Sequence, residues 1–160
     1  MTTVPGLHPK FPIWTDLEKK RWHSFSPREL ACKGSGEYWH DQLALDRLQN
    51  MRNRVGKPLV INSGHRSAAH NARVGGVPNS QHRKWAVDIS TDGHDRRQLV
   101  MEAIKVGFTG IGFGANFLHL DPRPTPVCWP YSGSMAPWAK AFGFDPLQRF
   151  RLAGLSGLLL

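Results

Sequence analysis

Residues 117–121 read FLHLD, and residues 80–88, earlier in the chain, read SQHRKWAVD. Each stretch pairs a histidine with an aspartate, His82 with Asp88 in the first and His119 with Asp121 in the second. Together they offer two imidazoles and a carboxylate from separate segments, the ligand set of a catalytic zinc site with one position open to water. These two stretches therefore predict both a metal site and the strands that carry it.

The second stretch has the alternation of a half-buried strand, since side chains along a strand point to opposite faces. Leu118 and Leu120 would enter the core, and His119 and Asp121 would emerge together on the other face. A lone histidine in a strand is more often structural than a ligand, but here the same face also carries a carboxylate.

The spacing from His82 to Asp88 raises a geometric question. Six residues of extended chain span roughly 20 Å, too far for both side chains to reach one ion. The segment must bend if both are ligands, and Trp85, Ala86 and Val87 include no glycine to ease a turn. The alternative is that Asp88 caps a strand end and His82 lies on the surface.

Length and composition favour one globular domain. The chain has 160 residues, of which 40% are hydrophobic and 21% charged, so disorder over its whole length is excluded. A net charge of +9 favours polyanionic partners such as nucleic acid, an anionic membrane or a bacterial wall. The basic residues are scattered, which is typical of a solvated surface, and no motif indicates specific nucleic-acid binding. Cys32 and Cys128 are either one disulfide or, by default, two free thiols.

Hydrophobic periodicity predicts an α+β fold, a small and mainly antiparallel sheet flanked by helices. The most regular helix is 41–55, with Leu45, Leu48, Met51 and Val55 on one stripe and Gly56 at its end. The other expected elements are a strand at 59–61 followed by a turn at 62–64, a short helix at 68–73, a strand at 87–89, a helix at 95–106, and a hairpin of 108–113 with 117–120.

The two ends differ from the middle. We expect residues 1–24 to form an extended arm or packing strap, residues 25–145 the domain, and residues 146–160 an apolar tail that docks on the domain or on a partner. Ser26 to Glu29 reads as a capped helix start with a capping box. No secretion signal and no stretch of transmembrane length is present, so we expect no membrane span.

An ordered set of short motifs resembles the zinc D-alanyl-D-alanine carboxypeptidase family, which includes phage endolysins and vancomycin-resistance dipeptidases. The lead-in FSPRELAC at 25–32 is similar to phage-type members, and the resemblance covers roughly residues 24–125. The motifs are INSGHRS at 61–67, HN at 70–71, VGG at 74–76, NSQH at 79–82, AVDI at 86–89, GIGF at 110–113 and FLHLDPRP at 117–124.

The resemblance implies the fold of that family, which is hedgehog-like, with Zn²⁺ held by His82, Asp88 and His119. It implies that Arg66 binds or polarises substrate near the metal, as an arginine fork suits a carboxylate or an oxyanion. It also matches Ser80 to a serine that would steady the first histidine ligand.

Two departures from the family pattern concern the site. In the family the aspartate lies seven positions after the first histidine, with a glycine between them, whereas in this chain Asp88 lies six positions after His82. Several relatives place a catalytic acid three residues before the last histidine, where this chain has Asn116. Asp121 is the candidate general base. The alternative is that its carboxylate forms a hydrogen bond to one of the metal ligands or a salt bridge to Arg123. His65 is a second candidate proton carrier.

The expected function is therefore a zinc metallopeptidase that cleaves peptidoglycan stem peptides, as a D,D-carboxypeptidase or an endopeptidase. A phage or prophage endolysin would wait in the host cytoplasm for holin-type release, whereas a virion-associated enzyme would act on the wall from outside with other virion proteins as partners. The alternative is a virion or structural protein that kept the fold and lost catalysis. Trp129, Tyr131 and Trp138 would line a groove or, by default, pack in the core.

Overall fold

The computed structural model describes residues 2–160, which form helices and strands in irregular alternation. The strands are β1 (Gly6–His8), β2 (Tyr38–His40), β3 (Ile61–Ser63), β4 (Val87–Ser90), β5 (Gly110–Phe113), β6 (Phe117–Asp121) and β7 (Val127–Pro130). The helices are α1 (Asp16–Arg21), α2 (Pro27–Leu30), α3 (Gln42–Val55), α4 (Ala68–Arg73), α5 (Arg96–Val106), α6 (Met135–Phe142) and α7 (Pro146–Ala153), with 3-10 turns η1 (Gln81–Arg83) and η2 (Leu155–Leu159).

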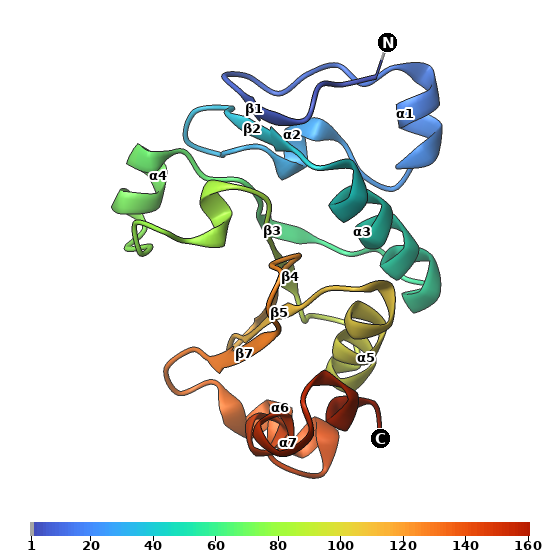
Figure 1. Ribbon diagram of the computed structural model, residues 1–160, viewed down its shortest axis with the longest axis vertical. Helices are drawn as coiled ribbons and strands as arrows, with labels where there is room; N and C mark the ends of the chain where they lie inside the picture. The colour runs from blue at the N-terminus through green and yellow to red at the C-terminus, as the bar shows by residue number, and fades with distance from the viewer. Residues whose placement is uncertain (1) are drawn as a thin grey trace.

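The central feature is a five-stranded sheet in the order β3-β4-β6-β5-β7, which confirms the α+β prediction. All neighbouring pairs are antiparallel except β5 and β7, which run parallel. The helices α3 and α5 pack together on one side of this sheet, and α4 lies on the other (Figure 1). A second, two-stranded sheet joins β1 to β2.

The predicted amphipathic helices form because their ends are capped and one face is apolar. Asp41 caps α3 through a bond from the Ala44 amide, and Gly56 ends the helix in the left-handed conformation at φ 74°. Asp95 and Gly107 play the same parts in α5. The capping box predicted at Ser26 and Glu29 is also present.

Strand β6 behaves as its alternation predicts. Leu118 and Leu120 are fully buried in the core, and the hairpin with β5 places Ile111 opposite Leu120. His119 and Asp121 lie on the opposite face of the same strand, where Gly112 and Gly110 are their register partners. The apolar face thus fixes the strand, and the polar pair is presented on the other side.

Two expectations are corrected. The strand predicted at 59–61 is β3 at Ile61–Ser63, so Asn62 and Ser63 are not a turn. Backbone pairing with β4 decides this, because Ser63 is opposite Asp88 across a bulge and pairing overrides the turn preference of these residues. The N-terminal segment also contains β1 and α1, and the Thr15–Glu18 capping box that starts α1 is visible in the sequence.

Both ends of the chain pack on the core. Trp14 and Trp22 are buried with ring centroids 5.0 Å apart, and Leu158 of η2 is buried against the same core.

Cys32 and Cys128 are free thiols. Among residues 2–160, no helix is long and apolar enough to cross a bilayer. The domain boundaries at 24/25 and 145/146 stay predictions.

The buried indole of Trp22 yields a stability prediction for the N-terminal segment. Trp22→Ala removes a side chain that is 1% exposed and whose Nε1 donates to Asp46, so unfolding free energy should fall by about 3–5 kcal/mol. Chemical denaturation measures this. Leu17→Ala, at a position 77% exposed in α1, is the control and should change stability by under about 0.5 kcal/mol. If Trp22→Ala lowered the unfolding free energy no more than Leu17→Ala, residues 1–24 would be an arm independent of the core.

Candidate metal centre

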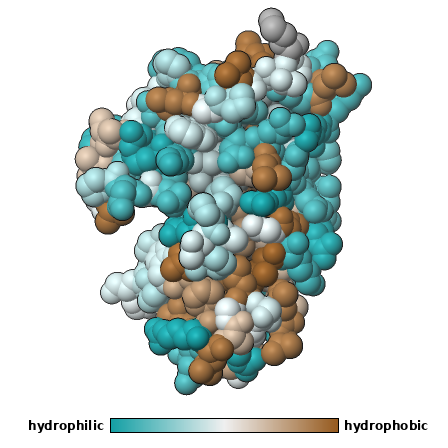
Figure 2. Space-filling view, in the orientation of Figure 1, coloured by the Kyte–Doolittle hydropathy of each residue, from teal (hydrophilic) through white to brown (hydrophobic). Residues whose placement is uncertain are grey.

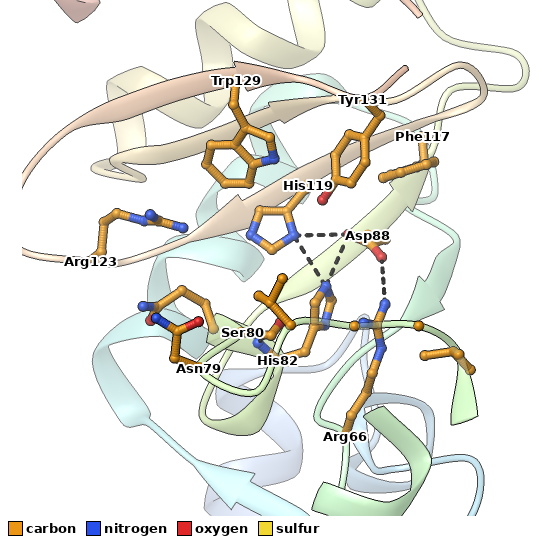
Figure 3. Close-up of a pocket in the computed structure, with 15 residues that line it drawn as sticks. Arg66, Asn79, Ser80, His82, Asp88, Phe117, His119, Arg123, Trp129 and Tyr131 are labelled. Atoms are coloured by element: carbon orange, nitrogen blue, oxygen red, sulfur yellow. Dashed lines mark hydrogen bonds and ion pairs between the residues drawn. The ribbon is translucent and has the colours of Figure 1, made fainter. Parts of the chain in front are cut away.

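Three side-chain atoms converge at one point on the open face of the sheet. His82 Nε2 lies 3.2 Å from Asp88 Oδ1 and 3.1 Å from His119 Nδ1, and His119 Nδ1 lies 3.0 Å from Asp88 Oδ1. Figure 3 shows the two imidazoles and the carboxylate facing one another. The predicted trio is therefore brought together, and all three residues are buried.

The connection from His82 to Asp88 bends as two ligands require. His82 lies on η1, whose start is capped by a bond from the His82 amide to Ser80 Oγ at 3.2 Å. The chain then turns at Lys84 (φ −120°, ψ −121°) and buries Trp85 against Phe108, with ring centroids 5.8 Å apart. A spacing of six therefore suffices, and the alternative of a surface His82 is wrong. Ser80 steadies the backbone of His82 rather than its ring.

The outer nitrogen of each imidazole fixes what its inner nitrogen offers. His82 Nδ1 lies 2.7 Å from the Gly64 carbonyl, which only accepts, so Nδ1 carries the proton. His119 Nε2 lies 2.7 Å from Asp121 Oδ2 and donates to this carboxylate. In the neutral form of each ring, the inward nitrogen therefore carries no hydrogen and offers a lone pair to a metal ion.

Three acceptors that face one another repel unless a cation or proton lies between them. Burial alone would raise the pKa of Asp88, but its contacts with the His119 and His82 imidazoles hold it well below its usual range. A tetrahedral zinc ion with bonds of about 2.0–2.1 Å separates its donors by about 3.3 Å, close to the distances found here. The donor set therefore fits a zinc ion with an open fourth position.

Asp121 lies behind His119 and is completely buried. Besides His119, it accepts two bonds from the Arg123 guanidinium, Nε to Oδ1 at 2.8 Å and Nη2 to Oδ2 at 2.6 Å. Burial would raise the pKa of Asp121, yet these bonds lower it, and the carboxylate stays ionised. Of the two roles considered for Asp121, the contacts favour orientation of His119 and the Arg123 pair over proton transfer at the open face.

Arg66 lies beside the cluster on the segment that follows β3. Its Nη2 is 3.4 Å from Asp88 Oδ2, and its Nε donates to Ser63 Oγ at 3.1 Å. The guanidinium also lies 3.4 Å from the Asn71 side-chain oxygen. These contacts hold a positive charge at the rim of the candidate centre.

The cluster opens into a cavity of about 620 Å³. Figure 2 shows the molecule hollowed on this side, between the region of α4 and the region of β7. One wall is the loop after α4, with Val74 and Val77, and another carries Phe117, Trp129 and Tyr131. The Trp129 ring lies against His119, with ring centroids 4.9 Å apart.

The other residues singled out in the sequence lie partly inside and partly outside the cavity. His65 is buried and bonded to Glu37 and to the Lys84 carbonyl, so it does not line the cavity. Asn116 is exposed on the hairpin turn and does not line it either. Trp138 packs in the core and donates to the Gly114 carbonyl, whereas Trp129 and Tyr131 are cavity residues.

Comparison with known protein families agrees with this arrangement. The family described as Peptidase M15 matches residues 23–121, which is more than half of the chain and includes every donor of the cluster. A search of curated proteins found no match.

The convergence of the donors predicts stoichiometric metal binding. The parent chain should hold about one zinc ion, and His119→Ala should weaken zinc affinity by more than about 100-fold, because it removes one of three ligands. Elemental analysis and calorimetric titration with Zn²⁺ measure this. His94→Ala, where the ring bonds the Pro58 carbonyl away from the cavity, should bind zinc as the parent does. Full zinc occupancy in His119→Ala would exclude its ligand role.

Asp121→Asn separates the two roles of that residue. If Asp121 orients His119, loss of its charge should weaken zinc affinity by about 10–100-fold. Asp46→Asn makes the same change in a pair with Arg21 away from the cavity, and should leave zinc affinity unaltered. Unchanged zinc affinity in Asp121→Asn, with turnover at least tenfold lower, would instead assign the general base to Asp121.

Proposed function

Because this chain belongs to the peptidase M15 family, we propose that it is a zinc-dependent peptidase that cleaves stem peptides of bacterial peptidoglycan. The observation that carries the proposal is the convergence of His82, Asp88 and His119 at the base of an open cavity. Metallopeptidase sites combine three protein ligands with one position left for water or substrate.

The proposed chemistry divides between the ion and the chain. When bound, a zinc ion supplies a Lewis acid that activates water and polarises the scissile carbonyl. His82 and His119 present neutral nitrogens to it, held by Gly64 and Asp121. Arg66 provides a positive charge beside the centre, where negative charge develops on the carbonyl oxygen.

The cavity and the surface support an anionic wall substrate. Arg66 and Arg123 both line the cavity, and Asp88 is its only carboxylate among the described lining residues. The net charge of +9 would also hold the protein near a wall rich in carboxylates and phosphates. Either the terminal D-Ala-D-Ala bond or an internal stem-peptide bond fits this proposal.

The rival proposal is a structural or virion protein that kept the fold without turnover. Two departures from the family pattern supported it, the short connection to Asp88 and the amide at Asn116. The connection still closes on the donor cluster, so it no longer favours the rival. Asn116 remains the one observation in its favour. An endolysin or virion setting rests on the lead-in at 25–32 and stays a prediction.

Purified peptidoglycan tests the proposal. The zinc-loaded chain should release peptides whose masses identify one cleaved bond, a chelator should abolish release, and added zinc should restore it. Arg66→Lys keeps the charge but loses the fork, and should lower kcat/KM by about 10²–10³-fold with zinc content unchanged. Arg151→Lys, on an exposed face of α7, is the matched control.

A zinc-loaded parent that releases no peptide from walls of several chemotypes, or from synthetic stem peptides, would favour the structural alternative.

A further inference from the structure

The cavity wall formed by β7 lies beyond the residues that match the family. Trp129 is on β7, and Tyr131 follows its last residue, Pro130. Both line the cavity, and within residues 2–160 strand β7 is attached to the sheet only through its parallel pairing with β5. These side chains therefore line the site from outside the region that the family model matches.

Tyr131 is held firmly in place. Its amide donates to the Phe113 carbonyl at 3.1 Å, which extends the attachment of β7 to β5 by one residue. The turn after it is closed by Ser134, which is 1% exposed and bonds the Tyr131 carbonyl through its amide at 3.2 Å and through its hydroxyl. The ring packs on Phe117, with ring centroids 4.9 Å apart, and against Trp129. Little freedom is left for this side chain.

The hydroxyl group of Tyr131 points at the donor cluster. Figure 3 shows it directed toward His119 and Asp88, on the side of the cluster away from Arg66. The charges of Asp88 and Arg66 both act on the phenol, and burial together with Asp88 raises its pKa. A phenol is protonated near neutral pH in any case, so this group is a hydrogen-bond donor.

The site needs such a donor. Both inward imidazole nitrogens and the Asp88 oxygens accept hydrogen bonds, and Arg66 is already engaged with Asp88, Ser63 and Asn71. The position at which relatives carry an acid is Asn116, which lies outside the cavity. An oxyanion that forms above the cluster would have Arg66 on one side, and a donor on the opposite side would complete its stabilisation, since preorganised donors are a large part of acyl-transfer catalysis.

We infer that Tyr131 is a catalytic residue, whose hydroxyl donates a hydrogen bond to the carbonyl oxygen of the scissile peptide as that oxygen becomes negative. No proton leaves the phenol, and no bond to it forms or breaks. The inference rests on the proposed peptidase function and adds to it a residue from outside the matched region.

The substitution Tyr131→Phe tests the inference because it keeps the ring that packs on Phe117 and removes only the donor. Turnover on the stem peptide identified by mass spectrometry should fall about 100-fold, with KM within about threefold and zinc content unchanged. Tyr38→Phe makes the same change at the other tyrosine, which is buried and bonded to His40 away from the cavity, and should leave turnover unaltered.

A second measurement is the affinity for an analogue of the transition state, which does not depend on turnover. A stem-peptide analogue in which a phosphinate replaces the cleaved amide should bind the zinc-loaded Tyr131→Phe chain more weakly, by the same factor as the loss in kcat/KM. Calorimetry measures this affinity. A tyrosine with a purely packing role would change the thermal midpoint or zinc content without this correspondence.

The outcomes separate the two proposals. Turnover and phosphinate affinity within threefold of the parent, at full zinc content, would overturn the role of Tyr131 and leave the peptidase intact. A parent chain that neither cleaves stem peptides nor binds the phosphinate would overturn the proposed function, and the role of Tyr131 with it.

Discussion

Mutual repulsion among three buried acceptor atoms is the constraint on which the rest of this structure depends. His82 Nε2, His119 Nδ1 and Asp88 Oδ1 lie 3.0–3.2 Å apart, an arrangement that is favourable only around positive charge. The fold maintains it from behind, because the Gly64 carbonyl and the Asp121 carboxylate each hold one imidazole by its outer nitrogen. The elements that supply these partners are distant in sequence, so the centre depends on the whole sheet.

The strand beside the cluster is built to leave room for it. Gly110 and Gly112 of β5 are the register partners of Asp121 and His119. A Cβ at Gly110 would meet the Asp121 carboxylate, and one at Gly112 would meet the His119 side chain and the Trp129 ring. Arg123 then covers the assembly, since its guanidinium binds Asp121 and lies 4.7 Å from the Trp129 ring centroid. The two glycines thus leave room for the His119–Asp121 pair, the indole lies against His119, and the arginine binds Asp121.

Much of this was predictable, because local patterns and short-range pairing agree. The alternation in FLHLD placed Leu118 and Leu120 inward and His119 outward, and the caps at Asp41 and Asp95 marked the helices. The bend at Lys84 was not predictable, since it follows from burial of Trp85 against Phe108, a contact between distant residues. The strand at Asn62 and Ser63 was missed because backbone pairing overrides side-chain preference. The sequence left open whether Tyr131 lines a groove or packs in the core, since the parallel pairing of β7 with β5 decides it.

The parallel pairing of β7 with β5 has a consequence for how the cavity could be altered. Strand β7 is at the border of the sheet, and none of the three converging donors is on it. A change of sequence in a border strand leaves the pairing of the inner strands β3, β4, β6 and β5 intact. Grafting a different 127–131 sequence onto the same inner strands is therefore a direct route to altered selectivity in a redesigned enzyme.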